Sequence, residues 1–155
     1  MKMKFQVNEN VLIPRSDTEI LVEEVIKLAE AEKKDILDLC TGSGAIGISL
    51  VKLLENAKVT ASDISENALE VARENAKELL EKENIKFTKS DMFENIEGKF
   101  DIIVSNPPYI KSNVIKDYIL EYEPNLALDR RRRWARLLQS YHRRRIQIFK
   151  DKPEL

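Results

Sequence analysis

The stretch DILDLCTGSGAIG, residues 35–47, decides the fold. Its first half, Asp35–Cys40, is a short and mainly apolar run that predicts a buried strand. Its second half, residues 42–47, has the spacing G-x-G-x-x-G and leads into a predicted helix that ends near Glu55. A strand that passes through such a turn into a helix is typical of a doubly wound α/β sheet, and Asp63, about 20 residues further on, ends the next predicted strand.

The glycine turn of residues 42–47 is suited to a ligand that contains a nucleoside. Its glycines let a ligand approach the backbone closely, and the amides at the start of a helix favour a negative group. The carboxylate of Asp63 can accept hydrogen bonds from both hydroxyls of a ribose. NAD and S-adenosylmethionine both carry an adenosine, so the turn alone leaves both ligands open, together with a tight turn that binds nothing.

Strands and helices alternate along the chain up to Ser105. Ser16, with Glu19 three residues later, forms a capping box, and Ser65 is placed to cap another helix. This alternation predicts an α/β domain with a parallel sheet. The further expected strands are residues 58–62, 85–88 and 100–105, and the expected apolar helix faces are Ile20, Leu21, Val25, Leu28 and Ala29, and Ala68, Leu69, Ala72, Ala76, Leu79 and Leu80.

The segment Asn106-Pro107-Pro108-Tyr109 follows the last of these strands, at the sheet edge where ligands bind in open α/β folds. A planar nitrogen, in an amide or an aromatic amine, is a poor nucleophile because its lone pair is delocalised. The Asn106 side-chain oxygen and a carbonyl held by the prolines could accept its two N–H groups, and the Tyr109 ring could stack on it. Prolines that only end a strand are the simpler alternative. The segment favours methyl transfer to a planar nitrogen, and hence S-adenosylmethionine over NAD.

These motifs together resemble the release factor glutamine methyltransferases, the HemK-type family of class I S-adenosylmethionine-dependent methyltransferases. The resemblance spans about Phe5 to Asp129, and family members usually carry glycine where Cys40 stands. The matching motifs are Val11-Leu12-Ile13-Pro14-Arg15 with Thr18-Glu19, residues 38–46, residues 61–65, Ser90-Asp91-Met92-Phe93, the Asn-Pro-Pro-Tyr segment, and residues 121–124 with 126–128.

The resemblance implies a fold, a reaction and a substrate. The fold is Rossmann-like α/β, with an incomplete doubly wound parallel sheet of about four strands in the order 3-2-1-4. The reaction transfers a methyl group from S-adenosylmethionine to the side-chain amide nitrogen of a glutamine, and no metal is implied. The substrate glutamine belongs to the Gly-Gly-Gln loop of a peptide chain release factor, which is the implied protein partner.

The resemblance also implies roles for individual residues. The loop after the first strand would surround the methionine part of the donor, Asp63 would hold its ribose, and Asp91 and Met92 would flank its adenine. The implied donor-binding residues are Cys40, Thr41, Gly42, Ser43, Gly44, Asp63, Asp91, Met92 and Asn106, and the residues implied to hold the substrate amide during catalysis are Asn106, Pro107, Pro108 and Tyr109.

The charge of the chain is divided unevenly. Residues 1–129 hold 16 basic and 25 acidic side chains, a net charge of −9, whereas residues 130–155 hold 10 basic and 2 acidic ones, a net charge of +8. The resemblance stops at the same point. We therefore expect residues 1–129 to be the N-terminal half of a methyltransferase catalytic domain, without the helical domain that usually precedes it. Residues 130–155 are expected to be an Arg-rich tail from a shifted reading frame, solvated or poorly ordered.

A chain that ends after the fourth strand of the family's sheet is expected to leave the outer edge of that strand open to self-association, and its turnover is expected to be impaired.

The composition, with 43% apolar residues, is typical of a globular domain. The chain has a single cysteine, Cys40, and it shows neither an apolar run of about 18 residues nor a secretory signal. These three observations favour a cytoplasmic protein without a membrane partner. The acidic residues 1–129 argue against a nucleic-acid partner. Three alternatives remain: an amino-methyltransferase of adenine or cytosine in nucleic acid, an inactive donor-binding fragment, and an NAD-dependent oxidoreductase.

Overall fold

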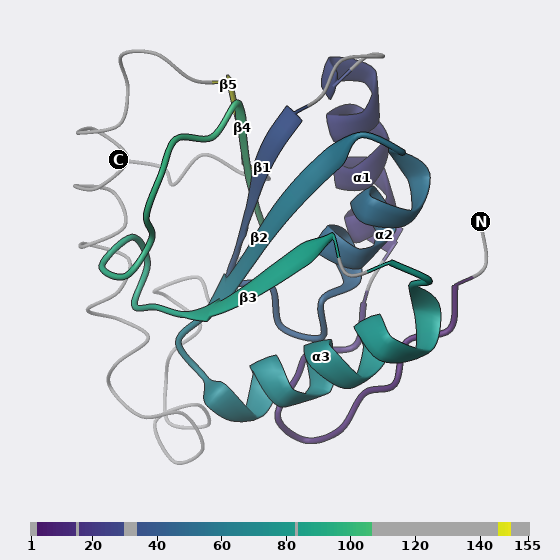
Figure 1. The fold of residues 1–155 in the computed structure, drawn as a ribbon. Helices are drawn as coiled ribbons and strands as arrows, with labels where there is room; N and C mark the ends of the chain where they lie inside the picture. The colour runs from purple at the N-terminus through teal and green to yellow at the C-terminus, as the bar shows by residue number, and fades with distance from the viewer. Residues whose placement is uncertain (1–2, 15, 30–33, 83, 107–145, 150–155) are drawn as a thin grey trace, which may run out of the picture. The chain divides into compact units, whose positions relative to one another are not determined.

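A parallel sheet with the strand order β3-β2-β1-β4-β5 forms the centre of the fold (Figure 1). This computed structural model describes residues 3–14, 16–29, 34–82, 84–106 and 146–149, and all of these belong to one of the chain's two compact units. The strands are Lys34–Leu39 (β1), Ala57–Asp63 (β2), Ile85–Lys89 (β3), Ile102–Ser105 (β4) and Ile146–Phe149 (β5), and the helices are Ser16–Ala29 (α1), Ala45–Leu53 (α2) and Glu66–Leu79 (α3).

The strand order confirms the predicted doubly wound topology. From β1 the chain passes to β2 and β3 on one side, and it then returns to place β4 on the other side of β1. Both neighbours run parallel to β1, and Leu39 at its end lies opposite Ser62 of β2 and Ser105 of β4. The direction of winding thus reverses between β1 and β4. Ligands of open α/β sheets bind beyond the carboxyl ends of the strands at such a reversal.

Strand β5 corrects one expectation. Its residues, Ile146–Phe149, belong to the tail that the sequence predicts to be solvated or poorly ordered, yet they pair in parallel with β4. They therefore cover the edge of β4 that was expected to be open. The sequence Ile-Gln-Ile-Phe is rich in strand-forming residues, and an uncovered strand edge is a template for pairing. The predicted boundary between residues 129 and 130 lies outside the described residues.

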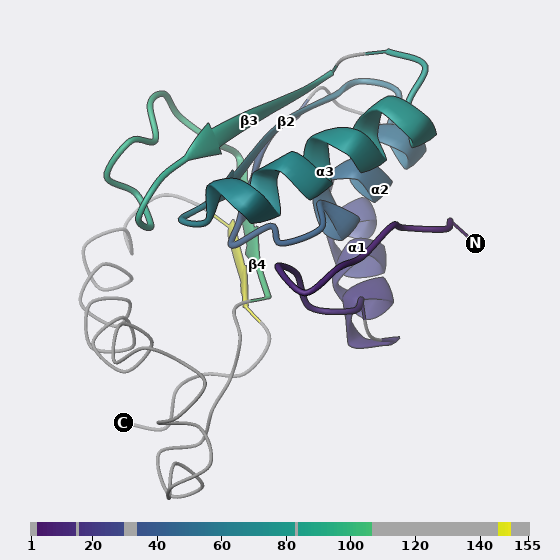
Figure 2. The same cartoon turned by 90° about the horizontal axis from the view of Figure 1, so that it is seen from below.

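The three helices lie together on one face of the sheet (Figures 1 and 2). Apolar residues of α1 and α2 pack there against residues of the strands. Within the described part of the chain, no helix has the length and apolar character that a membrane span requires. The buried apolar residues of this core are Leu21, Val22, Val25, Ala29, Ile36, Ile46, Leu50, Ala57, Val59, Ile102 and Val104.

Helix α1 buries a face that differs from the predicted one. Ile20 is 57% exposed and Leu28 is 39% exposed, whereas both were expected in the core. Each residue turns a helix by roughly 100°, which places Ile20 on the far side from the buried stripe and Leu28 at its margin. The residues that do form the buried stripe are Thr18, Leu21, Val22, Val25 and Ala29.

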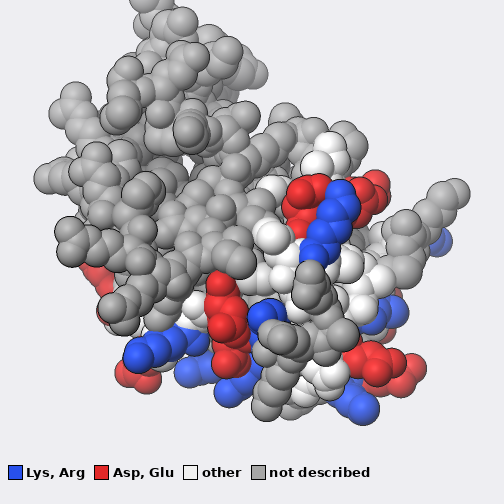
Figure 3. Space-filling view, turned by 90° about the horizontal axis from the view of Figure 1, so that it is seen from above, with Lys and Arg blue, Asp and Glu red and all other residues white. Residues whose placement is uncertain are grey.

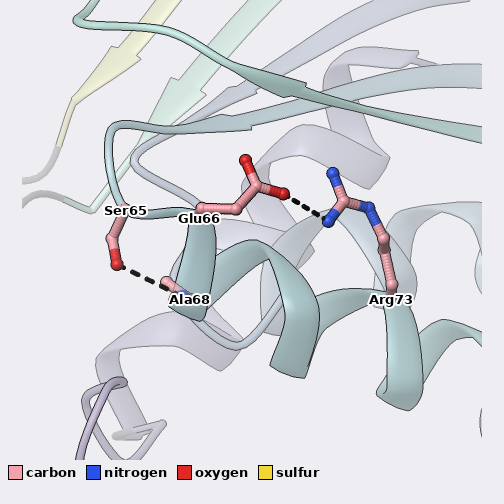
Figure 4. A network of polar contacts seen from close by, with 4 residues as sticks. All are labelled: Ser65, Glu66, Ala68 and Arg73. Atoms are coloured by element: carbon pink, nitrogen blue, oxygen red, sulfur yellow. Dashed lines mark hydrogen bonds and ion pairs between the residues drawn. The ribbon is translucent and has the colours of Figure 1, made fainter.

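Helix α3 begins as predicted, with Ser65 as its cap (Figure 4). The Ser65 hydroxyl accepts a hydrogen bond from the Ala68 N–H at 3.2 Å. Glu66 and Arg73 form an ion pair of 2.7 Å along the helix, and both side chains are well exposed, so the pair contributes little to stability. Of the predicted face, Ala68, Leu69, Ala72 and Ala76 are buried, whereas Leu79 and Leu80 are only half-buried. The buried face also contains the polar residue Asn75.

Replacing Gly44 with alanine is expected to destabilise the fold far more than the same change at Gly98. A Cβ on Gly44 would lie 2.7 Å from Ile48 Cδ1 and 3.1 Å from Ala72 Cβ, and φ is +82°. Gly98 has φ +95°, but among the residues that the structure describes nothing lies within 4 Å of an added Cβ. Urea unfolding should show a loss on the order of 2–4 kcal/mol for Gly44→Ala and about 1 kcal/mol for Gly98→Ala. Equal losses would contradict the packing argument.

Candidate functional site

The predicted donor residues lie at one edge of the sheet, where the parallel strands end. The register places Leu39 of β1 opposite both Ser62 and Ser105, so the chain segments that follow these residues leave the sheet side by side. Helices α2 and α3 begin at this edge (Figure 2). The segments gathered there are residues 40–44 after β1, Asp63 at the end of β2, residues 90–92 after β3 and Asn106 after β4.

The glycine turn is held by backbone hydrogen bonds and by two left-handed glycines. The Thr41 N–H donates to the Ser62 carbonyl at 2.9 Å, and the Gly44 N–H donates to the Thr41 carbonyl at 3.0 Å. Gly42 and Gly44 have φ values of +55° and +82°, a region that favours glycine. A Cβ on Gly42 would meet no atom of the described residues within 4 Å, so this part of the structure leaves open space beside the turn at this residue.

Asp38 of β1 connects the strand to the glycine turn through hydrogen bonds of its side chain. Its Oδ2 accepts hydrogen bonds from the Thr41 hydroxyl at 2.5 Å and from the Gly47 N–H at 2.9 Å, in the first turn of α2. The pKa of Asp38 is raised to about 6, because burial raises it more than the hydrogen bonds from Thr41 and Gly47 lower it, and the nearby Asp63 adds to the rise. Within the described residues, its Oδ1 is buried without a hydrogen-bond partner. Asp38 thus replaces the side-chain cap that Gly44 cannot supply to α2.

Asp63 also bonds to backbone amides at this edge. Its Oδ2 accepts from the Gly42 N–H and its Oδ1 from the Ser65 N–H, both at 3.0 Å. The sequence predicts that amides at this turn favour a negative ligand, but the Gly42 and Gly47 amides already donate to carboxylates of the protein. The turn is therefore better suited to a ligand with positive charge than to the pyrophosphate of a dinucleotide.

The segment after β3 is joined directly to the end of β2. The Ser90 N–H donates to the Asp63 carbonyl at 2.9 Å, and the Ser90 hydroxyl donates to the Met92 carbonyl at 2.8 Å. Met92 is buried and has φ +53°, so this tight turn places Asp91 and Met92 next to Asp63 along the edge. The two residues predicted to flank an adenine thus lie beside the residue predicted to hold the ribose.

Asn106 emerges from β4 beside the glycine turn. The preceding Ser105 is buried and its hydroxyl donates to the Leu39 carbonyl at 2.6 Å, which ties the end of β4 to the end of β1. The Asn106 Nδ2 lies 3.4 Å from the Thr18 hydroxyl oxygen of α1, to which it donates. The other predicted catalytic residues, Pro107, Pro108 and Tyr109, lie outside the described residues.

Two residues of this edge were missed by the sequence analysis. Asp38 stands in an apolar run directly before the glycines, and an acid in such a buried strand is itself a signal. Asn75 lies on the buried face of α3, and its Nδ2 donates to the Ser43 carbonyl at 2.9 Å. Its signal is an amide at a core position of an otherwise apolar helix face.

The family model of the methyltransferase small domain matches residues 16–122. The chain belongs to this family. One similar protein is the release factor glutamine methyltransferase of Leptospira interrogans serogroup Icterohaemorrhagiae serovar Lai, which is 51% identical over 133 residues, covering 80% of this chain and 46% of that protein. Another is the ribosomal protein uL3 glutamine methyltransferase of Francisella tularensis subsp. tularensis, which is 42% identical over 133 residues, covering 82% of this chain and 42% of that protein.

These relatives confirm the resemblance to release factor glutamine methyltransferases, and the chain spans about half the length of the curated relatives it matches. Among solved structures, magnesium protoporphyrin IX methyltransferase from Synechocystis PCC 6803, with bound SAH, is similar to this methyltransferase small domain. The TM-score is 0.51 and the sequences are 26% identical, over 57% of this chain and 40% of that one. The Rossmann-like class I methyltransferase fold is thereby confirmed.

Replacing Cys40 with glycine is expected to stabilise the fold. Cys40 has φ +62°, a left-handed conformation that costs a residue with a Cβ roughly 1–2 kcal/mol. Part of this gain is offset because glycine has more freedom in the unfolded chain, so the net gain should be about 1 kcal/mol or less. Denaturant unfolding of Cys40→Gly measures it, and Cys40→Ala, which keeps the Cβ, should show no gain. A less stable Cys40→Gly would contradict the strain.

Asp38 is expected to weaken the fold as the pH rises from about 4 to about 6. Its pKa is about 6 in the folded protein and 3.8 in a model compound, so between these values the folded state binds more protons than the unfolded state and stability falls with rising pH. Asp38→Asn removes this titration. The difference in unfolding free energy between the two proteins should therefore change by on the order of 2–3 kcal/mol between pH 4 and pH 6.5. If the unfolding free energies of the unsubstituted chain and of Asp38→Asn changed in parallel over this pH range, the raised pKa of the buried Asp38 carboxylate would be contradicted.

Proposed function

We propose that this methyltransferase small domain binds S-adenosylmethionine and methylates the side-chain amide nitrogen of the glutamine in the Gly-Gly-Gln loop of a peptide chain release factor. The observation that carries the proposal is the position of Asn106. It follows β4 where Ser105 is bonded to Leu39, so it lies beside the glycine turn at the point where the sheet reverses its winding. The 51% identity to the Leptospira release factor glutamine methyltransferase supports the same substrate.

The residues at the sheet edge fit the methyl donor. The donor would supply an electrophilic methyl group on a positively charged sulfur. The turn of Cys40 to Gly44 would hold its methionine part, in the open space beside Gly42, and Asp63 would accept hydrogen bonds from its ribose. Asp91 and Met92 would flank its adenine. The Gly42 and Gly47 amides donate to carboxylates of the protein, and this negative charge favours a cationic ligand. The same charge disfavours the pyrophosphate of NAD, which argues against the NAD-dependent oxidoreductase.

The substrate amide would be held by the segment that Asn106 begins. The Asn106 Nδ2 donates to Thr18, and this contact would orient the Asn106 carbonyl oxygen as an acceptor for the substrate N–H. Pro107, Pro108 and Tyr109 would complete this corner as the resemblance implies. The proposal needs no strong general base, because an amide nitrogen becomes acidic once it has been alkylated.

A second candidate substrate is the glutamine of ribosomal protein uL3, because a relative of that name is 42% identical to this chain. Its glutamine shares the planar amide chemistry of the release factor glutamine. A nucleic-acid substrate is less favoured. On the face seen in Figure 3, Lys and Arg side chains of the described residues are interspersed with Asp and Glu rather than gathered into one basic patch.

Incubation with labelled S-adenosylmethionine separates these candidates. The tested acceptors are a release factor, a variant of that release factor with Gln→Ala in its Gly-Gly-Gln loop, ribosomal protein uL3 and duplex DNA. Label is expected in the release factor alone, and the Gln→Ala variant should abolish it. Asn106→Ala should lower the transfer rate by about 100-fold or more. Label in DNA or only in uL3 would overturn the proposed substrate, and donor binding without transfer to any acceptor would favour the inactive donor-binding fragment.

A further inference from the structure

Asn75 is a polar side chain within the buried face of α3. It is fully buried, and an amide in that position is costly unless its polar atoms are paired. Its Oδ1 accepts from the Gln6 N–H at 2.7 Å, and its Nδ2 donates to the Gln6 carbonyl and to the Ser43 carbonyl, each at 2.9 Å. Both amide hydrogens and the oxygen are therefore used. This set of partners explains why the position holds an amide rather than an apolar residue.

The bonds with Gln6 attach the N-terminal segment, residues 3–14, to the body of the domain. The Asn75 amide pairs with both backbone polar groups of Gln6, much as a neighbouring strand would. The Gln6 side chain makes a further bond, from Nε2 to Glu78 Oε2 at 2.7 Å, but this contact is exposed to solvent. The two backbone bonds are partly buried, because they end on the buried Asn75 side chain.

The bond to Ser43 attaches the same side chain to the glycine turn. The peptide between Ser43 and Gly44 is held at both ends, because its carbonyl accepts from Asn75 and its N–H donates to the Thr41 carbonyl at 3.0 Å. α3 can approach this closely because Gly44 lacks a side chain, and a Cβ there would lie 3.1 Å from Ala72 Cβ. One amide thus joins the N-terminal segment to the turn that is proposed to hold the methyl donor.

We propose that Asn75 is a positioning residue that couples docking of the N-terminal segment to the geometry of the donor turn, an inference that rests on the proposed function for its relevance to the donor. The docked segment orients the Asn75 amide so that Nδ2 holds the Ser43 carbonyl. If the segment is released, Asn75 Oδ1 loses the Gln6 N–H as its hydrogen-bond partner, and the amide is free to turn away from Ser43. Coupling is reciprocal, so bound donor should in turn stabilise the docked segment.

A pair of substitutions at residue 6 isolates the coupling in the full chain. Gln6→Pro and Gln6→Ala both remove the side-chain bond to Glu78, but only the proline removes the N–H that donates to Asn75. With no methyl-donor ligand added, hydrogen exchange of the Gly44 amide should be at least about fivefold faster in Gln6→Pro than in Gln6→Ala. Equal exchange in the two variants would overturn the proposal.

Donor binding is the second readout, with S-adenosylhomocysteine as the probe in calorimetry. Gln6→Pro should bind it about fivefold to tenfold more weakly than Gln6→Ala, which should match the unsubstituted chain. Asn75→Asp, whose carboxylate cannot donate to Ser43, should show a similar loss. If the unsubstituted chain binds no probe, the proposed function fails, whereas the Gly44 exchange still decides the coupling. Binding that is equal in both residue 6 variants would overturn the coupling alone.

Discussion

The hydrogen bonds of the buried Asp38 carboxylate hold β1 and the first turn of α2 in a single arrangement. One oxygen receives both the Thr41 hydroxyl and the Gly47 N–H, so the strand, the turn and the helix are tied at one atom. A charged group without contact to water is costly, and the raised pKa of Asp38 reflects that cost. The close approach also explains the third glycine of the turn, since a Cβ on Gly47 would lie 3.1 Å from Asp38 Oδ2.

This arrangement decides the charge that the turn presents to a ligand. In a dinucleotide site the amides of such a turn face a pyrophosphate. Here the Gly47 amide donates to Asp38 and the Gly42 amide donates to Asp63, so negative charge of the protein already occupies the start of α2. The same glycine spacing is therefore better suited here to a cationic ligand, such as the proposed methyl donor, than to a pyrophosphate. Membership of the methyltransferase small domain family agrees with this electrostatic reasoning.

The sheet edge is assembled by contacts between segments that are far apart in the sequence. Ser105 bonds to Leu39 and so brings Asn106 to the glycine turn, and Asn75 joins the turn to Gln6. Each of these bonds uses a buried side chain whose polar atoms would be costly to leave unpaired. The site is consequently part of the folding core rather than a set of loops placed on it. Substitutions there are expected to affect stability and ligand binding together.

Through its resemblance to a known family, the sequence implied the strand order. By itself it determined the alternation of strands and helices, the glycine turn, the Ser65 cap and the residues that follow each strand. These features depend on local patterns: apolar periodicity, glycine spacing and capping residues. Only the tertiary structure decided which face α1 buries, that Ile146–Phe149 covers β4, and that Asp38 and Asn75 hold the turn. The physical reason is that a buried face and a hydrogen-bond partner depend on packing between distant segments, as with Gln6 and Asn75, which a pattern read along one chain does not contain.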